Sequence, residues 1–230
     1  MFRPLTVVPF AVVAALSLVS SPASAATAER GHWMLDEDGS STAADSSGNG
    51  NVGTNYNVVG DGSGYTFNGR DSRVVVPNAT SLNPGLADFS WGVTLSMTSP
   101  PDAGDSYDVL RKGLATTKGG NYKLEVKNSS GRAIARCSSK SIRADGTKVA
   151  AAIQGSSNLA DGKPHIVRCV KTSSSITLYV DALAPRTKTF ASALGSVSNT
   201  SHLALGAKAE DSTTSGFDWF EGRIYDAWVA

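Results

Sequence analysis

The sequence contains little charge and few cysteines, and each scarcity excludes a class of protein. Only 18% of the 230 residues are charged, and 21 Lys and Arg stand against 20 Asp and Glu. This near-neutral balance excludes a nucleic-acid binder that relies on electrostatic attraction, and the low charge with 23 glycines does not fit a coiled coil. Two cysteines are too few for a disulfide-dense miniprotein or a four-cysteine zinc site. The length suits one compact domain.

Long apolar runs are also scarce, and the one clear case lies at the N-terminus. Met1–Ala25 places Arg3 before the apolar segment Val7–Val19 and ends in Ala23-Ser24-Ala25. A positive charge, an apolar core and an A-x-A site in this order are typical of a secretory signal peptide. The core is too short to cross about 30 Å of hydrocarbon. We therefore expect cleavage after Ala25, a secreted, extracellular protein without a membrane span, and a single domain over residues 26–230.

Secretion changes the interpretation of the two cysteines. In an oxidising compartment, two cysteines of one chain most simply pair with each other. Each follows an arginine, in Arg136-Cys137 and Arg168-Cys169. Period-two alternation on a strand then directs the cysteines inward and the arginines outward. We predict a Cys137–Cys169 disulfide rather than a redox-active or nucleophilic thiol, for which a C-x-x-C motif is missing.

Apolar residues alternate with a period of two over most of the chain, whereas helical periodicity is nearly absent. Gly, Asn, Asp, Ser and Pro cluster between the alternating segments. Many short strands at near-regular spacing indicate a two-sheet sandwich or a barrel. The expected strands are His32–Leu35, Gly64–Phe67, Arg73–Val76, Phe89–Met97, Tyr107–Lys112, Asn121–Lys127, Arg132–Ser138, Lys148–Ile153, His165–Lys171, Ile176–Val180, His202–Gly206 and Phe217–Val229.

Several motifs follow one another along these strands. They include Trp33-Met-Leu-Asp-Glu37, Gly64-Tyr-Thr-Phe-Asn-Gly69, Asp161-Gly-Lys-Pro-His165, Leu178-Tyr-Val-Asp181 and Phe220-Glu-Gly-Arg-Ile-Tyr-Asp226. In this order, the motifs resemble a laminin-G-like domain of the concanavalin A-like lectin/glucanase superfamily. The resemblance implies an all-β fold, a two-sheet antiparallel β-sandwich of the jelly-roll, concanavalin A-like type. It implies less about activity, because this fold hosts enzymes, lectins and protein-binding modules.

The carboxylates do not form the arrangement that glycosidases of this fold use. Such enzymes need a pair of carboxylates, which the retaining glucanases of the group space as Glu-x-Asp-x-x-Glu. None of the five glutamates in the chain lies in that pattern, and there is no G-x-S-x-G motif. The three histidines lie far apart without the spacing of metal ligands. We expect a non-catalytic protein, with a glycoside-active enzyme as the less favoured alternative.

One loop carries oxygen ligands suited to calcium. Asp45-Ser-Ser-Gly-Asn-Gly-Asn51 offers Asp45, Asn49 and backbone carbonyls, which are the ligands that Ca²⁺ prefers. The resemblance implies a structural calcium between this region and a carboxylate of the last strand, here Asp226. The alternative is an Asx-rich turn, which the same residues form without a metal.

Alternation also predicts a mostly cationic face. A strand with its apolar residues inward directs Lys123 outward, and other strands direct Arg132, Arg136 and Arg168 outward. If these strands are neighbours, they form a basic face that could hold an anionic glycan. Tyr179 is an aromatic candidate for stacking on a sugar. The alternative is an ordinary solvated sheet face.

The four tryptophans lie inside strand-like runs, which predicts core packing rather than a platform for sugars. They are Trp33, Trp91, Trp219 and Trp228. Together, these observations predict a secreted, non-catalytic module that binds carbohydrate or a cell-surface glycan. An extracellular protein-interaction or structural domain is the alternative function.

Overall fold

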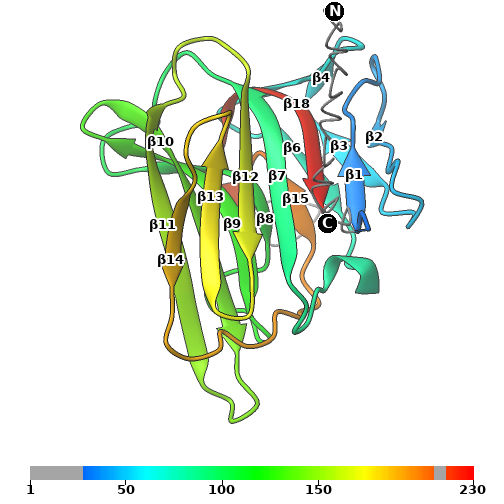
Figure 1. Cartoon of the computed structure of the whole chain (residues 1–230). Helices are drawn as coiled ribbons and strands as arrows, with labels where there is room; N and C mark the ends of the chain where they lie inside the picture. Colours follow the sequence, from blue (N-terminus) through cyan, green and yellow to red (C-terminus); the bar gives the residue numbers. More distant parts are fainter. Residues whose placement is uncertain (1–27, 210–215) are drawn as a thin grey trace, which may run out of the picture.

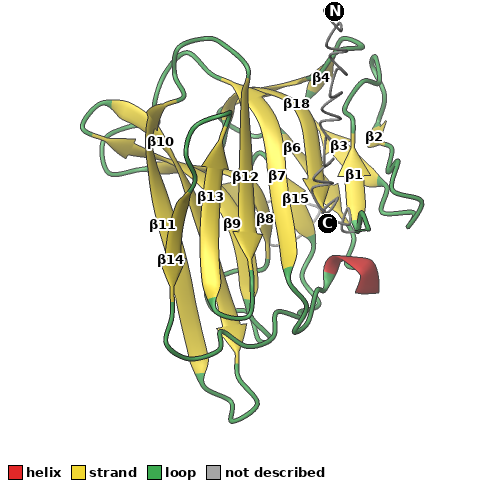
Figure 2. Ribbon diagram, viewed as in Figure 1, coloured by secondary structure: helices red, strands yellow, loops and turns green. Residues whose placement is uncertain are grey.

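The computed structural model describes residues 28–209 and 216–230, and these residues form two antiparallel β-sheets that pack as a sandwich (Figure 1). The predicted signal peptide, Met1–Ala25, lies outside the described residues. Strands dominate the structure, and a short 3₁₀ helix, η1 (Thr80–Leu82), lies at its edge (Figure 2). The prediction of an all-β, two-sheet antiparallel sandwich is confirmed. No helix within the described ranges is long and apolar enough to cross a membrane.

We call the two layers sheet I and sheet II. Sheet I contains, in spatial order, β14 (Arg186–Thr189), β13 (Ser175–Val180), β12 (His165–Lys171), β7 (Phe89–Ser96), β18 (Glu221–Val229), β5 (Tyr65–Asn68) and β4 (Val59–Gly60), and β1 (Gly31–Trp33) also pairs with β18. Sheet II contains β11 (Lys148–Asn158), β10 (Arg132–Ile142), β9 (Asn121–Ser129), β8 (Ser106–Lys112), β15 (Leu203–Leu205), β6 (Arg73–Val76), β3 (Gly53–Tyr56) and β2 (Thr42–Ala43). A separate two-stranded hairpin consists of β16 (Lys208–Ala209) and β17 (Gly216–Phe217).

The core lies between the sheets and is built from the residues that alternation directs inward. Its aromatic centre contains Phe89 and Trp91 of β7, whose rings stack at 5.0 Å, and Tyr122 of β9, whose ring lies 5.2 Å from that of Phe89. Trp33 and Trp91 are fully buried, as predicted. The Tyr122 hydroxyl donates a hydrogen bond to the Leu82 carbonyl oxygen at 3.1 Å, which satisfies this polar atom inside the core.

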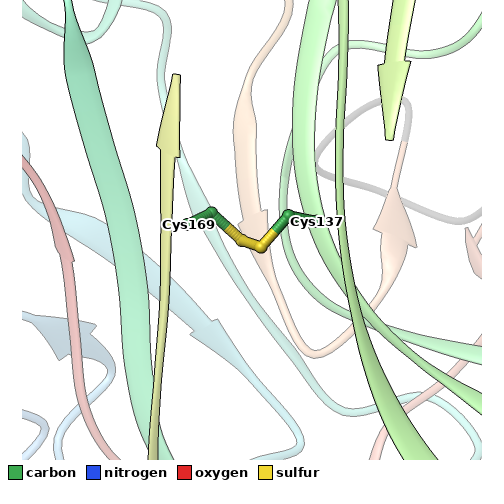
Figure 3. Close-up of a disulfide and its surroundings, with 2 residues drawn as sticks. All are labelled: Cys137 and Cys169. Atoms are coloured by element: carbon green, nitrogen blue, oxygen red, sulfur yellow. A yellow bond between two sulfur atoms is a disulfide. The ribbon is translucent and has the colours of Figure 1, made fainter. Parts of the chain in front are cut away.

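A disulfide joins the two sheets through the core, as Figure 3 shows. Cys137 projects inward from β10 of sheet II and Cys169 from β12 of sheet I, and both are fully buried. Their Cα atoms lie 5.6 Å apart, within the range that a disulfide spans. The predicted Cys137–Cys169 pair is therefore confirmed.

The expected strand Phe217–Val229 is interrupted in the structure. β17 ends at Phe217 and β18 begins at Glu221, because Asp218 between them adopts a left-handed backbone with φ of 54°. Asp tolerates this conformation better than most residues, and a strand cannot continue through it. Short strands such as β14 were also not expected, because its four residues are all exposed and carry no apolar alternation.

Candidate functional site

The five residues proposed for one binding face lie on opposite sides of the sandwich. Lys123, Arg132 and Arg136 project from the outer face of sheet II, whereas Arg168 and Tyr179 project from the outer face of sheet I. The predicted single basic face is therefore wrong. The neighbours of β12 in its sheet are β13 and β7, whereas β9 and β10 belong to the other sheet.

The disulfide explains this separation. Cys137 and Cys169 point toward each other across the core, so the residues that precede them, Arg136 and Arg168, point away from each other into solvent. The outward direction of each arginine was predicted correctly. Whether the two arginines share one face depends on the order of the strands in the sheets, and apolar alternation does not reveal that order.

Cations on the outer face of sheet II are paired with buried carboxylates. Glu125 is 2% exposed and accepts hydrogen bonds from Lys123 and from Arg136. Asp108, on the neighbouring strand β8, is fully buried and accepts from Lys123 at 3.1 Å and from Arg111 at 2.5 Å. Burial would raise the pKa of Glu125, but the charges and hydrogen bonds of Lys123 and Arg136 lower it below its usual value. We call these five residues the charge network.

The chain between the hairpin and β18 lies against this face. The Asp108 amide donates to the Asp218 carbonyl oxygen at 2.8 Å, and the Arg73 guanidinium lies 5.8 Å from the centre of the Trp219 ring. This segment creates two hollows with Asp218 on the border of both. Burial raises the pKa of Asp218, and the nearby charge of Asp108 adds to the effect.

The first hollow, which we call the aromatic hollow, has a volume of about 490 Å³. Three aromatic side chains line it, namely Tyr107, Phe217 and Trp219, together with the carboxylates Asp102, Asp105, Asp218 and Glu221. Phe217 is 62% exposed, an unusual exposure for a large apolar ring. Burial raises the pKa of Tyr107, with the charges of Glu221 and Asp102 contributing, so its hydroxyl stays a hydrogen-bond donor at neutral pH.

The second hollow, of about 270 Å³, is cationic. Arg111, Lys123 and Arg136 of the charge network line it. The further lining residues include the cations Lys140 and Lys208 and several small or polar side chains. Carboxylates of the charge network lie side by side on β8 and β9. Glu125 is held ionised by two cations, so it has no proton to give as a general acid.

Sequence reasoning missed the aromatic hollow, although its signal was present. Phe217-Asp-Trp-Phe220 is the densest aromatic group in the chain, and the alternation pattern places it inside one continuous strand. The left-handed turn at Asp218 separates the roles of these rings, so Phe220 is buried while Phe217 and Trp219 reach the surface. Trp219 and Trp228 are both partly exposed, contrary to the expectation of core packing.

The residues proposed for calcium already have hydrogen-bond partners. Asp45 accepts from the backbone amides of His32, Ser47 and Asn51 at 2.7–3.0 Å through its two oxygens. The Asn49 side-chain amide donates to the Glu29 carbonyl oxygen. These are the contacts of an Asx turn. Within residues 28–209 and 216–230, no group of three or more His, Cys, Asp or Glu side chains is arranged to hold a metal.

Two of the three histidines bridge pairs of carboxylates. His32 contacts Asp226 at 2.7 Å and Glu29 at 3.2 Å. Burial would lower its pKa, but the hydrogen bond and charge of Asp226, with help from Glu29, raise it above 6.5. The third proposed calcium ligand, Asp226, is thus bonded to the same residue whose amide binds Asp45.

His165 is bonded in the same way to Asp181 at 2.8 Å and Asp161 at 3.0 Å. Burial would lower its pKa, and these two carboxylates outweigh that effect and raise it. These contacts tie the loop before β12 to the turn after β13, and they are the contacts of a structural histidine.

Comparisons with known proteins place the fold among β-sandwich domains. No protein-family model matches the chain, and no curated protein matches it. Among solved structures, the binding domain of Botulinum neurotoxin serotype G aligns with a TM-score of 0.60 at 13% identity over 88% of this chain. The binding domain of Paraclostridial Mosquitocidal Protein 1 aligns with a TM-score of 0.57 at 15% identity over 86%.

A Trypanosoma rangeli sialidase in complex with 2,3-difluorosialic acid aligns with a TM-score of 0.58 at 15% identity over 88% of this chain. The chain spans 47% of each toxin domain and 30% of the sialidase. At these identities the likeness concerns the fold, and the protein is a jelly-roll β-sandwich.

Proposed function

We propose that this protein is a secreted, non-catalytic carbohydrate-binding module of the laminin-G-like type that binds its glycan in the aromatic hollow. The observation that carries the proposal is the exposure of Phe217 beside Tyr107 and Trp219 around one cavity. Aromatic rings stack on the C–H faces of sugar rings, and carboxylates accept hydrogen bonds from sugar hydroxyls. Both kinds of group line this hollow.

The charge of the hollow selects the class of glycan. Among the described residues that line it, Asp102, Asp105 and Glu221 are acidic and none is a cation, while Lys208 lies nearby with its ammonium 5.8 Å from the centre of the Phe217 ring. An anionic glycan would be repelled there, so a neutral sugar or an amino sugar suits the hollow better. Of the cations expected from the sequence to bind an anionic glycan, Lys123 and Arg136 are instead engaged by Glu125 and Asp108.

Other features support the separate parts of this proposal. Secretion is supported by the signal-peptide pattern and by the disulfide, which forms and persists in oxidising compartments. Binding is supported by the similar folds of two domains that are named binding domains and of a sialidase that holds a sugar analogue. A non-catalytic role is supported by the charge network, whose cations hold Glu125 ionised.

Calcium is a separate prediction, because Asp45, Asn49 and Asp226 are not among the described residues that line the hollow. For Ca²⁺ to bind, Asp45 would exchange backbone amides for the ion, and Asp226 would release His32. The structure does not favour that exchange, and a binding measurement decides it.

A glycan array probed with the chain from residue 26 onward tests the proposal. We expect binding to neutral or amino sugars rather than to sialylated or sulfated ones. Phe217→Ala should then weaken binding about tenfold, equivalent to about 1.4 kcal/mol. Leu86→Ala is the matched control, because Leu86 is 75% exposed and lies outside the hollow. An array without any bound glycan would refute the proposal and favour an extracellular protein partner.

A further inference from the structure

The outer face of sheet I carries a straight row of residues that lies outside both hollows. Tyr179 of β13 pairs with Arg168 of β12, Arg168 with Gly92 of β7, Gly92 with Trp228 of β18, and Trp228 with His32 of β1. In each strand the residues on either side of these positions are buried, so the row itself faces outward. We call it the outer row.

In the outer row the Trp228 ring lies against the sheet and the Tyr179 ring stacks with Arg168. A Cβ atom at Gly92 would lie only 2.4 Å from Cζ2 of Trp228, so the indole covers the glycine backbone and occupies the place of its missing side chain. The Arg168 guanidinium carbon lies 4.3 Å from the centre of the Tyr179 ring, a stacked cation–π contact. Trp228 and Tyr179 are both partly exposed, as expected of rings with one covered face and one open face.

Polar groups border this aromatic row. Ser90 and Thr94 lie two residues before and after Gly92 on β7, and both are partly exposed. Asp226 pairs in register with Thr94, and its carboxylate is bonded to His32 at the end of the row. With neighbouring strands about 4.8 Å apart, β13 and β18 are separated by about 14 Å. This is a strip long enough for several consecutive sugar rings.

We propose that the outer row is a second binding surface, which takes the flat face of an extended, unbranched polysaccharide of equatorially substituted pyranose rings. The C–H faces of such a chain stack on Trp228 and Tyr179, and its edge hydroxyls meet Ser90 and Thr94. A flat strip suits an extended polymer, whereas the aromatic hollow suits one or a few sugar units. A protein partner would have to bury Arg168, His32 and Asp226 together, which costs desolvation of three charged or titratable groups.

The test is depletion of the chain from residue 26 onward by microcrystalline cellulose and by chitin. Trp228→Ala and Tyr179→Ala should each lower the partition constant about tenfold. Arg168→Lys keeps the charge but loses the planar stack, so it should also weaken adsorption. Leu86→Ala is the control, since Leu86 is 75% exposed and lies outside the outer row and its polar border, and it should stay within about twofold.

Further measurements separate polysaccharide binding from misfolding and from self-association. Thermal unfolding and near-UV circular dichroism show whether Trp228→Ala still folds, and Tyr179→Ala carries the test if it does not. Phe217→Ala should adsorb normally, while Tyr179→Ala should bind normally on the glycan array, so the two surfaces can fail independently. The proposal is wrong if the wild type does not adsorb to either polymer. It is also wrong if none of the three outer-row variants weakens adsorption, or if light scattering shows that Trp228 mediates self-association instead.

Discussion

Reduction of the disulfide should destabilise the protein by about 3.7 kcal/mol at 25 °C. Cys137 and Cys169 are 32 positions apart, and opening a loop of this length returns that much conformational freedom to the unfolded chain in the chain-entropy model. Both sulfur atoms are buried and stay in the core as thiols after reduction. The crosslink is therefore lost with little change in packing, and the loop term dominates the result.

Urea unfolding of the oxidised and the reduced protein, followed by tryptophan fluorescence, measures this difference. The buried Trp33 and Trp91 report on the core between the sheets. The double variant Cys137→Ala/Cys169→Ala is the control, because its stability should not respond to the reductant. A loss below about 1 kcal/mol on reduction would refute the loop argument and indicate residual structure in the reduced unfolded chain.

Three further measurements follow from the buried charges and the loops. Glu125→Gln should lower the free energy of unfolding in urea by about 3 kcal/mol, because Lys123 and Arg136 then face each other without their carboxylate. The control Glu221→Gln, at an exposed position, should change it by no more than about 0.5 kcal/mol. Equal effects of the two substitutions would contradict a buried ion network. His32 and His165 have raised folded pKa values, so their contribution is complete below the unfolded pKa of 6.5 and is lost as the pH rises through the folded values. The urea midpoint should therefore fall above about pH 6.5, and a midpoint that rises there would be the opposite result. If the Asp45 loop binds calcium, excess calcium should raise the melting temperature and Asp45→Asn should abolish that response. A melting temperature unchanged by EDTA in a calcium-loaded sample would end the calcium hypothesis.

Strands with a clear buried face could be predicted from the sequence. β9 shows why, because Tyr122, Leu124 and Val126 alternate with charged residues and are all fully buried. β14 shows the limit, since its four residues are all exposed and pair with β13 without an apolar face, and this leaves no alternation in the side chains. The break at Asp218 was also hidden, because one left-handed residue interrupts a strand without changing the apolar content around it.

The candidate sites depended on contacts between distant strands. Phe217 and Tyr107 are 110 positions apart, and they share a hollow only because the chain after the hairpin lies against β8. In the alternation pattern, Glu125 is one negative charge on a basic face. The register of β8, β9 and β10 instead places it between Lys123 and Arg136 as a buried ion-pair partner.

The sequence by itself determined the all-β class, the inward direction of the core residues and the disulfide, because each depends on period-two alternation or on a count of two cysteines, and the motifs that resemble a laminin-G-like domain favoured a sandwich over a barrel. Alternation states whether a side chain faces inward or outward, but it does not state which sheet the strand joins. Only the tertiary structure decided that Arg136 and Arg168 face opposite sides of the sandwich and that Trp228 lies flat over Gly92. The physical reason is that sheet order is set by hydrogen bonding and packing between segments far apart in the chain.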